Sequence, residues 1–252
     1  MQILLTNDDG IYAPGLAALE RELVKIGDVS VVAPAVEQSG VGHSVTFLSP
    51  LIPKELFEGT KRRGWAVDGS PADCVKLGIA EFCPRRPDLV VSGINGGLNA
   101  GINVLYSGTV AAAIEGAFFD ITSIAVSLEF DEYAQFDKAA EMARKIIEQV
   151  LESKGPAPQL YNLNIPTVAL REPTDVRVVP MGVARYGESF IERRDPRGRR
   201  YFWATNDPPP PPGHFETDLT ALAKGYVTLT PLKFDMTEPR ELESMRSWKL
   251  EI

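Results

Sequence analysis

Two adjacent carboxylates near the start of the chain are the side chains with the clearest potential for chemistry. Asp8 and Asp9 follow directly on Gln2–Leu5, a short apolar run typical of a buried strand, and Gly10 then allows the chain to turn. Apolar residues at helical spacing follow from Pro14 onward, so the turn joins a strand to a helix. A turn of this kind lies at the carboxyl edge of a parallel sheet. Because adjacent carboxylates repel each other and lose hydration on burial, a bound cation would stabilise them. A solvated Asp-Asp-Gly turn is the alternative interpretation.

Polar side chains also follow the next two predicted strands. Ser39 lies in the polar loop after the strand at 29–33, and Asn95 and Asn99 lie in the glycine-rich loop after the strand at 89–91. Parallel strands direct such loops to one edge of a sheet. Carboxylate, hydroxyl and carboxamide oxygens form a hard donor set, which suits Mg²⁺ or Mn²⁺ and is poor for Zn²⁺.

A third feature is the start of the helix predicted from Ser107. Ser107, Gly108 and Thr109 would offer backbone N–H groups and hydroxyls there, which are suitable ligands for a phosphate. An acidic metal site beside a phosphate cradle indicates phosphoryl chemistry. Each feature also has a simpler interpretation, with Ser107 as a helix N-cap and the segment at 92–103 as a flexible loop.

Other charged side chains carry weaker predictions. His43 shares a loop with Ser39 and is a possible proton donor to a leaving group, although a metal can stabilise a leaving alkoxide without a general acid. His214 follows five prolines and is expected to be structural. A cluster of arginines is expected to form a solvated face, or to contact another subunit or a polyanion: Arg193, Arg194, Arg197, Arg199 and Arg200.

Strands and helices alternate over residues 1–180. We expect strands at 2–5, 29–33, 89–91, 123–128, 160–165 and 176–179, irregular strands or a hairpin at 45–69, and helices from about 14, 70–82, 107–119 and 137–150, the last capped by Asp137. This alternation favours an α/β fold whose parallel sheet is covered by helices on both faces.

Residues 181–252 differ in character. They contain a predicted hairpin at 186–203, a stiff run of prolines at 208–212, a short helix at 217–224, a strand at 226–230 and a terminal helix from about 238. Since this segment has too little apolar content for a core of its own, we expect an arm on the 1–180 core within a single domain.

Overall composition limits the function classes. The net charge of −8 argues against a general role on nucleic acid or anionic membranes, but not against small phosphates that a local metal attracts. Cys74 and Cys83 are too few for a disulfide framework or a zinc knuckle. The N-terminus has no basic region or long apolar stretch, so we expect a cytoplasmic protein without a membrane partner.

Successive sequence blocks resemble the signature blocks of the SurE family of stationary-phase survival proteins, and they span about Leu4 to Leu232. The blocks are NDDGIYAPGL, APAVEQSGVGHS, DGSPADCVKLG, PDLVVSGINGGLNAG, YSGTVAAAIEG and TDLTALAKGYVTLTPL. The resemblance implies a metal-dependent 5′/3′-nucleotidase acting on nucleoside monophosphates, with polyphosphate as a further substrate of some members. It also implies a Rossmann-like three-layer sandwich with a mostly parallel sheet, whose C-terminal segment is exchanged between subunits of a homodimer or homotetramer.

The same resemblance assigns site residues. One divalent ion per subunit, Mg²⁺ or Mn²⁺, is implied at Asp8, Asp9, Ser39 and Asn95, with phosphate contacts from Asn99, Ser107, Gly108 and Thr109. The predicted reaction is in-line attack of a metal-activated water on phosphorus, with Asp8, Asp9 and Asn99 as catalytic residues. The alternatives are a nucleotide-sugar transferase, whose aspartates only hold the metal of a diphosphate, and a non-catalytic nucleotide-binding protein.

Overall fold

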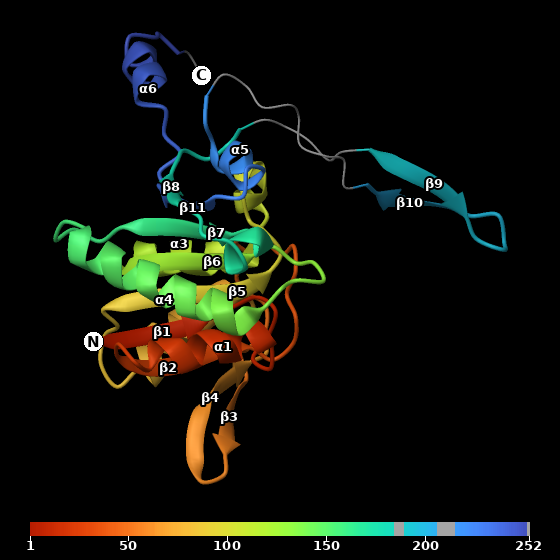
Figure 1. The fold of residues 1–252 in the computed structure, drawn as a ribbon. Coiled ribbons are helices and arrows are strands. Elements are labelled where there is room, and N and C mark those ends of the chain that lie inside the picture. Colours follow the sequence, from red (N-terminus) through yellow and green to blue (C-terminus); the bar gives the residue numbers. More distant parts are fainter. Residues whose placement is uncertain (184–188, 206–214, 251–252) are drawn as a thin grey trace.

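The computed structural model describes residues 1–183, 189–205 and 215–250 of the chain. Within them, nine strands form one sheet in the order β3-β4-β2-β1-β5-β6-β7-β11-β8 (Figure 1). The strands of this sheet are β1 (Gln2–Thr6), β2 (Asp28–Pro34), β3 (Pro53–Glu58), β4 (Lys61–Val67), β5 (Leu89–Gly96), β6 (Thr122–Leu128), β7 (Leu160–Ile165), β8 (Val176–Val178) and β11 (Val227–Leu232). The helices are α1 (Pro14–Leu23), α2 (Pro71–Leu77), α3 (Gly108–Phe118), α4 (Phe136–Ser153), α5 (Asp218–Leu222) and α6 (Pro239–Met245).

The sheet is parallel through its centre and antiparallel towards both edges. The neighbouring strands β4, β2, β1, β5, β6 and β7 run parallel to one another. At one edge β3 is antiparallel to β4, while at the other β11 is antiparallel to β7 and parallel to β8. The carboxyl ends of β1, β2 and β5 therefore lie at the same edge of the sheet.

Helices cover both faces, which confirms the predicted three-layer sandwich. Side chains alternate along β1, so that Ile3 and Leu5 pack in the cluster that includes α1 and α4 residues, whereas Leu4 packs in the cluster with α2 and α3. All three side chains are fully buried. Among the described residues, no helix combines the length and the apolar character needed to cross a membrane.

The structure corrects two sequence predictions. The strand predicted at 89–91 continues to Gly96, because β5 resumes pairing with β6 after an irregularity between Ser92 and Asn95. Glycine permits this: a Cβ at Gly93 would lie 2.3 Å from the Val126 carbonyl oxygen. Asp137 does not cap α4, since Gln135 is the N-cap and Asp137 instead pairs with Arg21 at 2.5 Å.

The C-terminal segment divides into a part that joins the sheet and parts that do not. The strand predicted at 226–230 is β11, which lies inside the sheet between β7 and β8 and is preceded by α5. A separate hairpin of β9 (Phe190–Arg194) and β10 (Arg200–Ala204) projects away from the sandwich, and α6 has no buried residue (Figure 1). The proline run at 208–212 and His214 lie outside the described residues.

Candidate active site

Asp8 lies in a buried position at the end of β1, against the start of α3. Its side chain is 5% exposed, and its Oδ1 accepts a hydrogen bond from the Thr109 hydroxyl. A Cβ at Gly108 would lie 2.9 Å from Asp8 Cβ and 3.1 Å from Asp8 Oδ2. Only glycine therefore allows the first turn of α3 to approach the carboxylate this closely.

Asp9 is the half-buried neighbour at the same sheet edge. Its Oδ2 accepts a hydrogen bond of 3.1 Å from the backbone N–H of Gly96, at the end of β5. The β1 turn and the end of β5 are therefore joined through this carboxylate.

The environment of both carboxylates disfavours negative charge. The pKa of Asp8 is raised to about 6, because burial, the largest cause, and the charge of Asp9 raise it by more than the Thr109 hydrogen bond lowers it. Burial also raises the pKa of Asp9, the Gly96 N–H opposes the rise, and the charge of Glu37 adds to it. A cation held between the carboxylates would offset these costs.

The loop after β2 brings Ser39 to this edge and adds a third carboxylate. The backbone N–H of Gln38 donates to the carbonyl oxygen of Asp8 at 2.8 Å, so the loop lies against the β1 turn. The Ser39 hydroxyl, which is exposed, donates to Glu37 Oε1 at 2.5 Å. Glu37 is not among the predicted site residues, although its place two residues before Ser39 in the same polar loop indicates that it could lie near them.

Asn95 lies near the end of β5, next to the Gly96 that contacts Asp9. Its side-chain nitrogen donates to the Gly97 carbonyl oxygen at 2.6 Å. Across the described part of the chain, no group of three or more His, Cys, Asp or Glu side chains could hold a metal. A metal site here therefore depends on the neutral oxygens of Ser39 and Asn95 beside two aspartates, and that donor set fits a hard divalent ion.

Asn99 is held in place by its neighbours on two strands. Its Nδ2 donates to the Ser127 hydroxyl at 2.9 Å, which leaves its second amide hydrogen for a ligand. Its backbone N–H donates to Asn164 Oδ1, and its carbonyl oxygen accepts from Asn162 and Asn164 Nδ2 at 2.7 and 3.1 Å. Nothing in the local sequence pattern of Ser127, Asn162 and Asn164 indicates which loop they contact, so these residues could not be predicted from the sequence.

The start of α3 differs from a simple phosphate cradle. Ser107 is the N-cap, with its Oγ accepting a 3.1 Å bond from the Val110 N–H, and its own O–H can still donate to a ligand. Thr109 is fully buried, and its hydroxyl is committed to Asp8. The Thr109 hydroxyl therefore serves the Asp8 carboxylate, and a phosphate contact of Thr109 stays a prediction.

His43 contacts the middle of α3. Its Nε2 lies 2.8 Å from Glu115 Oε2, and its ring stacks on Phe118 with centroids 5.3 Å apart. Glu115 is 3% exposed and also lies 3.4 Å from Lys76 Nζ. Glu115 and Phe118 are beyond the first turn of α3, whereas the backbone N–H of Gly42, next to His43, donates to the Tyr106 carbonyl oxygen beside Ser107. Proton donation by His43 to a leaving group stays a prediction.

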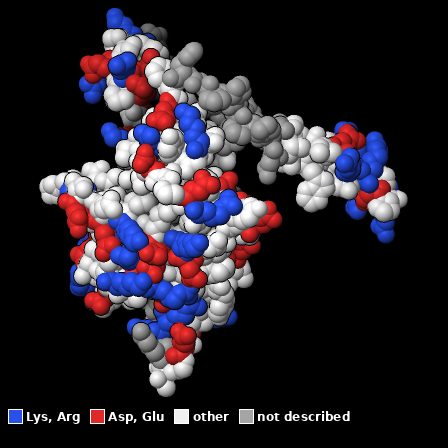
Figure 2. All heavy atoms as spheres, viewed as in Figure 1, with Lys and Arg blue, Asp and Glu red and all other residues white. Residues whose placement is uncertain are grey.

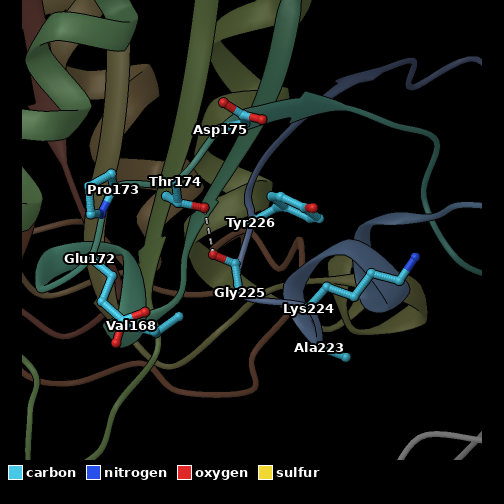
Figure 3. A pocket seen from close by; sticks show the side chains of 9 residues that line it. All are labelled: Val168, Glu172, Pro173, Thr174, Asp175, Ala223, Lys224, Gly225 and Tyr226. Atoms are coloured by element: carbon cyan, nitrogen blue, oxygen red, sulfur yellow. Dashed lines mark hydrogen bonds between the residues drawn. The ribbon is translucent and has the colours of Figure 1, made fainter.

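A cavity of about 570 Å³ lies elsewhere, beside β8 and β11 (Figure 3). Thr174 donates a hydrogen bond of 2.9 Å to the Gly225 carbonyl oxygen at this cavity, and Glu172, Asp175 and Lys224 also line it. None of the predicted site residues lines it, and β6, β7 and β11 separate β8 from β5 in the sheet. This cavity is not the site formed by the β1 and β5 loops.

The fold and the site define an α/β protein with an acidic, oxygen-rich centre at the carboxyl edge of a parallel sheet. Residues 3–188 match the model of the family described as survival protein SurE. A relative in Rhodopirellula baltica, named 5′-nucleotidase SurE, is 56% identical over 251 residues, which cover 99% of each chain. One of the same name in Desulforudis audaxviator is 42% identical and covers 100% of this chain and 98% of its own.

The structural comparison agrees. The crystal structure of SurE protein from Aquifex aeolicus has a TM-score of 0.83 and 38% identity, covering 98% of both chains. The chain belongs to the SurE family.

Proposed function

We propose that this chain is a metal-dependent nucleotidase, which hydrolyses nucleoside 5′- and 3′-monophosphates to nucleoside and phosphate. The observation that carries the proposal is the pair of buried Asp8 and half-buried Asp9, held by Thr109 and Gly96 at an edge where polar loops meet. The relatives named 5′-nucleotidase SurE, up to 56% identical, support the same activity.

Asp8, Asp9, Ser39 and Asn95 would hold one divalent ion, Mg²⁺ or Mn²⁺. The fit rests on an all-oxygen donor set and on the raised pKa of both aspartates, which a cation would bring down. When bound, such an ion would supply a nucleophile at neutral pH and neutralise charge on the phosphoryl oxygens.

The residues of the chain have the remaining tasks. Asp8 or Asp9 orients the attacking water, while the free amide hydrogen of Asn99, the Ser107 hydroxyl and the Gly108 N–H neutralise the phosphoryl oxygens. Because both carboxylates would serve as metal ligands, neither would be free to attack phosphorus itself. A single displacement with inversion at phosphorus follows.

The test is phosphate release from a panel of nucleoside 5′- and 3′-monophosphates. We expect turnover to stop with a chelator and to return when Mg²⁺ or Mn²⁺ is restored. A nucleotide-sugar transferase would hydrolyse no monophosphate, and a nucleotide-binding protein would bind without turnover. Activity that survives exhaustive chelation would contradict the metal site.

Thr109→Val is expected to impair catalysis through Asp8. The substitution keeps the volume but removes the buried hydroxyl that donates to Asp8 Oδ1, and a bond to a charged group contributes about 1.5–3 kcal/mol. kcat/KM should fall roughly ten- to a hundredfold, with a higher metal concentration needed for half-maximal rate. Thr109→Ser retains the hydroxyl and is the matched control. If Thr109→Val instead weakens inhibition by inorganic phosphate and leaves the metal dependence unchanged, the Thr109 hydroxyl contacts the substrate rather than acting through Asp8.

We further propose a cytoplasmic homodimer or homotetramer in which two parts of residues 181–252, the β9–β10 hairpin and α6, dock on another subunit, while α5 and β11 pack within their own chain. Several large apolar side chains of the β9–β10 hairpin are exposed, including Phe190 and Trp203 at 66% each, and α6 buries no residue in its own chain. Figure 2 shows that basic side chains, which are all arginines in this hairpin, gather at its far end beside fewer acidic ones, and this excess of positive charge supports contact with an acidic surface or with polyphosphate. Duplex nucleic acid is not a proposed partner, given the net charge of −8.

A further inference from the structure

Asp218 is a buried carboxylate that the reaction outlined above does not use. It is 0% exposed, and its partners among the described residues are three backbone N–H groups. Asp218 Oδ2 accepts from Gly101 at 2.8 Å, and Oδ1 accepts from Gly182 at 2.7 Å and from Leu219 at 2.8 Å. Since burying an ionised group is costly unless its oxygens are well bonded, these contacts must be maintained together.

Helix capping does not explain Asp218. Thr217 is the N-cap of α5, and it forms a reciprocal pair of hydrogen bonds with Thr220. The two long-range bonds of Asp218 instead join α5 to the loop after β5, through Gly101, and to the segment after β8, through Gly182.

The three segments meet with no spare volume. A Cβ at Gly101, whose φ is +58°, would lie 2.8 Å from Leu219 Cδ1 and 3.1 Å from the Gly182 carbonyl oxygen. A Cβ at Gly182 would lie 2.9 Å from Leu219 Cδ1 and 3.2 Å from Asp218 Oδ1. Gly101 and Gly182 therefore form the packing site, or seat, of the Asp218 and Leu219 side chains. Gly101 has little freedom to shift while both side chains occupy it.

Gly101 lies between the two groups that contact phosphate in the proposed reaction. It follows Asn99 by two residues and begins the short helical turn Gly101–Leu105, which leads to Ser107. Side chains of β7 hold the Asn99 end of this loop, as described above, and Asp218 holds the Gly101 end. We propose that Asp218 is a positioning residue, which sets the distance and orientation between Asn99 and the start of α3 for the phosphoryl group; this inference rests on the proposed function.

The central test compares Asp218→Asn with Thr217→Ala. Asparagine keeps the shape, but its NH₂ group would face an N–H donor, so the bond to Gly101 or to Gly182 is lost. Thr217→Ala weakens the same helix without touching Gly101 and is the matched control. With metal present, we expect Asp218→Asn to lower kcat roughly ten- to a hundredfold, and Thr217→Ala to lower Tm with kcat nearly unchanged.

A second readout does not depend on turnover. Amide hydrogen exchange of the metal-free protein should speed up at Gly101 in Asp218→Asn and stay as in the wild type in Thr217→Ala. Leu219→Ala opens the seat but keeps the carboxylate, so it should also speed up amide exchange at Gly101, by less than Asp218→Asn does. This variant covers the case in which Asp218→Asn does not fold.

Equal kcat values for Asp218→Asn and Thr217→Ala, or unchanged exchange at Gly101 in both Asp218→Asn and Leu219→Ala, would overturn the inference. Failure of the proposed function has a different signature. The wild type would then release no phosphate from any monophosphate, while exchange at Gly101 would still respond to Asp218→Asn.

Discussion

Asp8→Asn should be inactive and, without metal at neutral pH, more stable than the wild type. Burial raises the pKa of Asp8 from 3.8 to about 6, which corresponds to about 3 kcal/mol of destabilisation in the charged form. Asparagine removes the charge and keeps an oxygen that can accept from Thr109. We therefore expect the free energy of unfolding to rise by up to about 3 kcal/mol at pH 7.5.

The pH dependence of this effect has a definite sign. Below pH 3.8 the carboxyl is protonated in both the folded and the unfolded chain, and the charge costs nothing. Between pH 3.8 and about 6 the unfolded chain releases the proton first, so the wild type loses stability as pH rises. Above about pH 6 the full cost applies, so the gain from Asp8→Asn should be absent at the acidic end and largest above pH 6.

Urea unfolding in the presence of a chelator, at several pH values, checks the expectation. Asp137→Asn is a suitable control because the Asp137 side chain is 81% exposed and an exposed ion pair contributes little. Activity of Asp8→Asn with saturating metal should fall by at least roughly a hundredfold, because a charged ligand is lost. A variant less stable than the wild type at pH 7.5 would contradict the account of the charge cost.

Two truncations should behave very differently. A chain that ends at Asp207 lacks β11, which pairs with β7 from Thr228 to Leu232 and with β8 from Val227 to Leu229. Its removal exposes β7 and detaches β8, so we expect an unfolded or aggregating protein. A chain that ends at Asp235 keeps β11 and also Phe234, whose ring packs edge-on against Phe118 at 4.7 Å. It loses α6, which buries nothing in its own chain, and should fold.

The shorter deletion tests subunit exchange separately from folding. Circular dichroism should show native secondary structure for the chain that ends at Asp235. Sedimentation should show a smaller or weaker assembly than the full chain forms, if the C-terminal segment docks on a neighbour. An unchanged assembly would show that α6 is not part of the subunit interface, and the β9–β10 hairpin would be the remaining candidate.

The sequence was sufficient to predict the sandwich and the sheet edge, because both follow from local patterns. The apolar run before Asp8 and the strand-helix alternation require only neighbouring residues. The contact of Thr109 with Asp8 and the seat of Asp218 at Gly101 join residues about a hundred positions apart. Such pairs depend on the packing of separate elements, which no periodicity encodes. Gly93 shows the reverse error: the sequence predicts a loop there, but Gly93 lets β5 approach Val126 of β6 closely, and β5 then continues to Gly96.

The place of β11 also sets an order of events during synthesis. About sixty residues separate the end of β7 from the start of β11, its partner in the sheet. At roughly 5–20 residues per second, the ribosome needs on the order of 3 to 12 seconds to make them. During that interval the nascent chain presents the open edge of β7 to its surroundings. β11 is the strand that closes this edge, so the sheet can be completed only after β11 has been made.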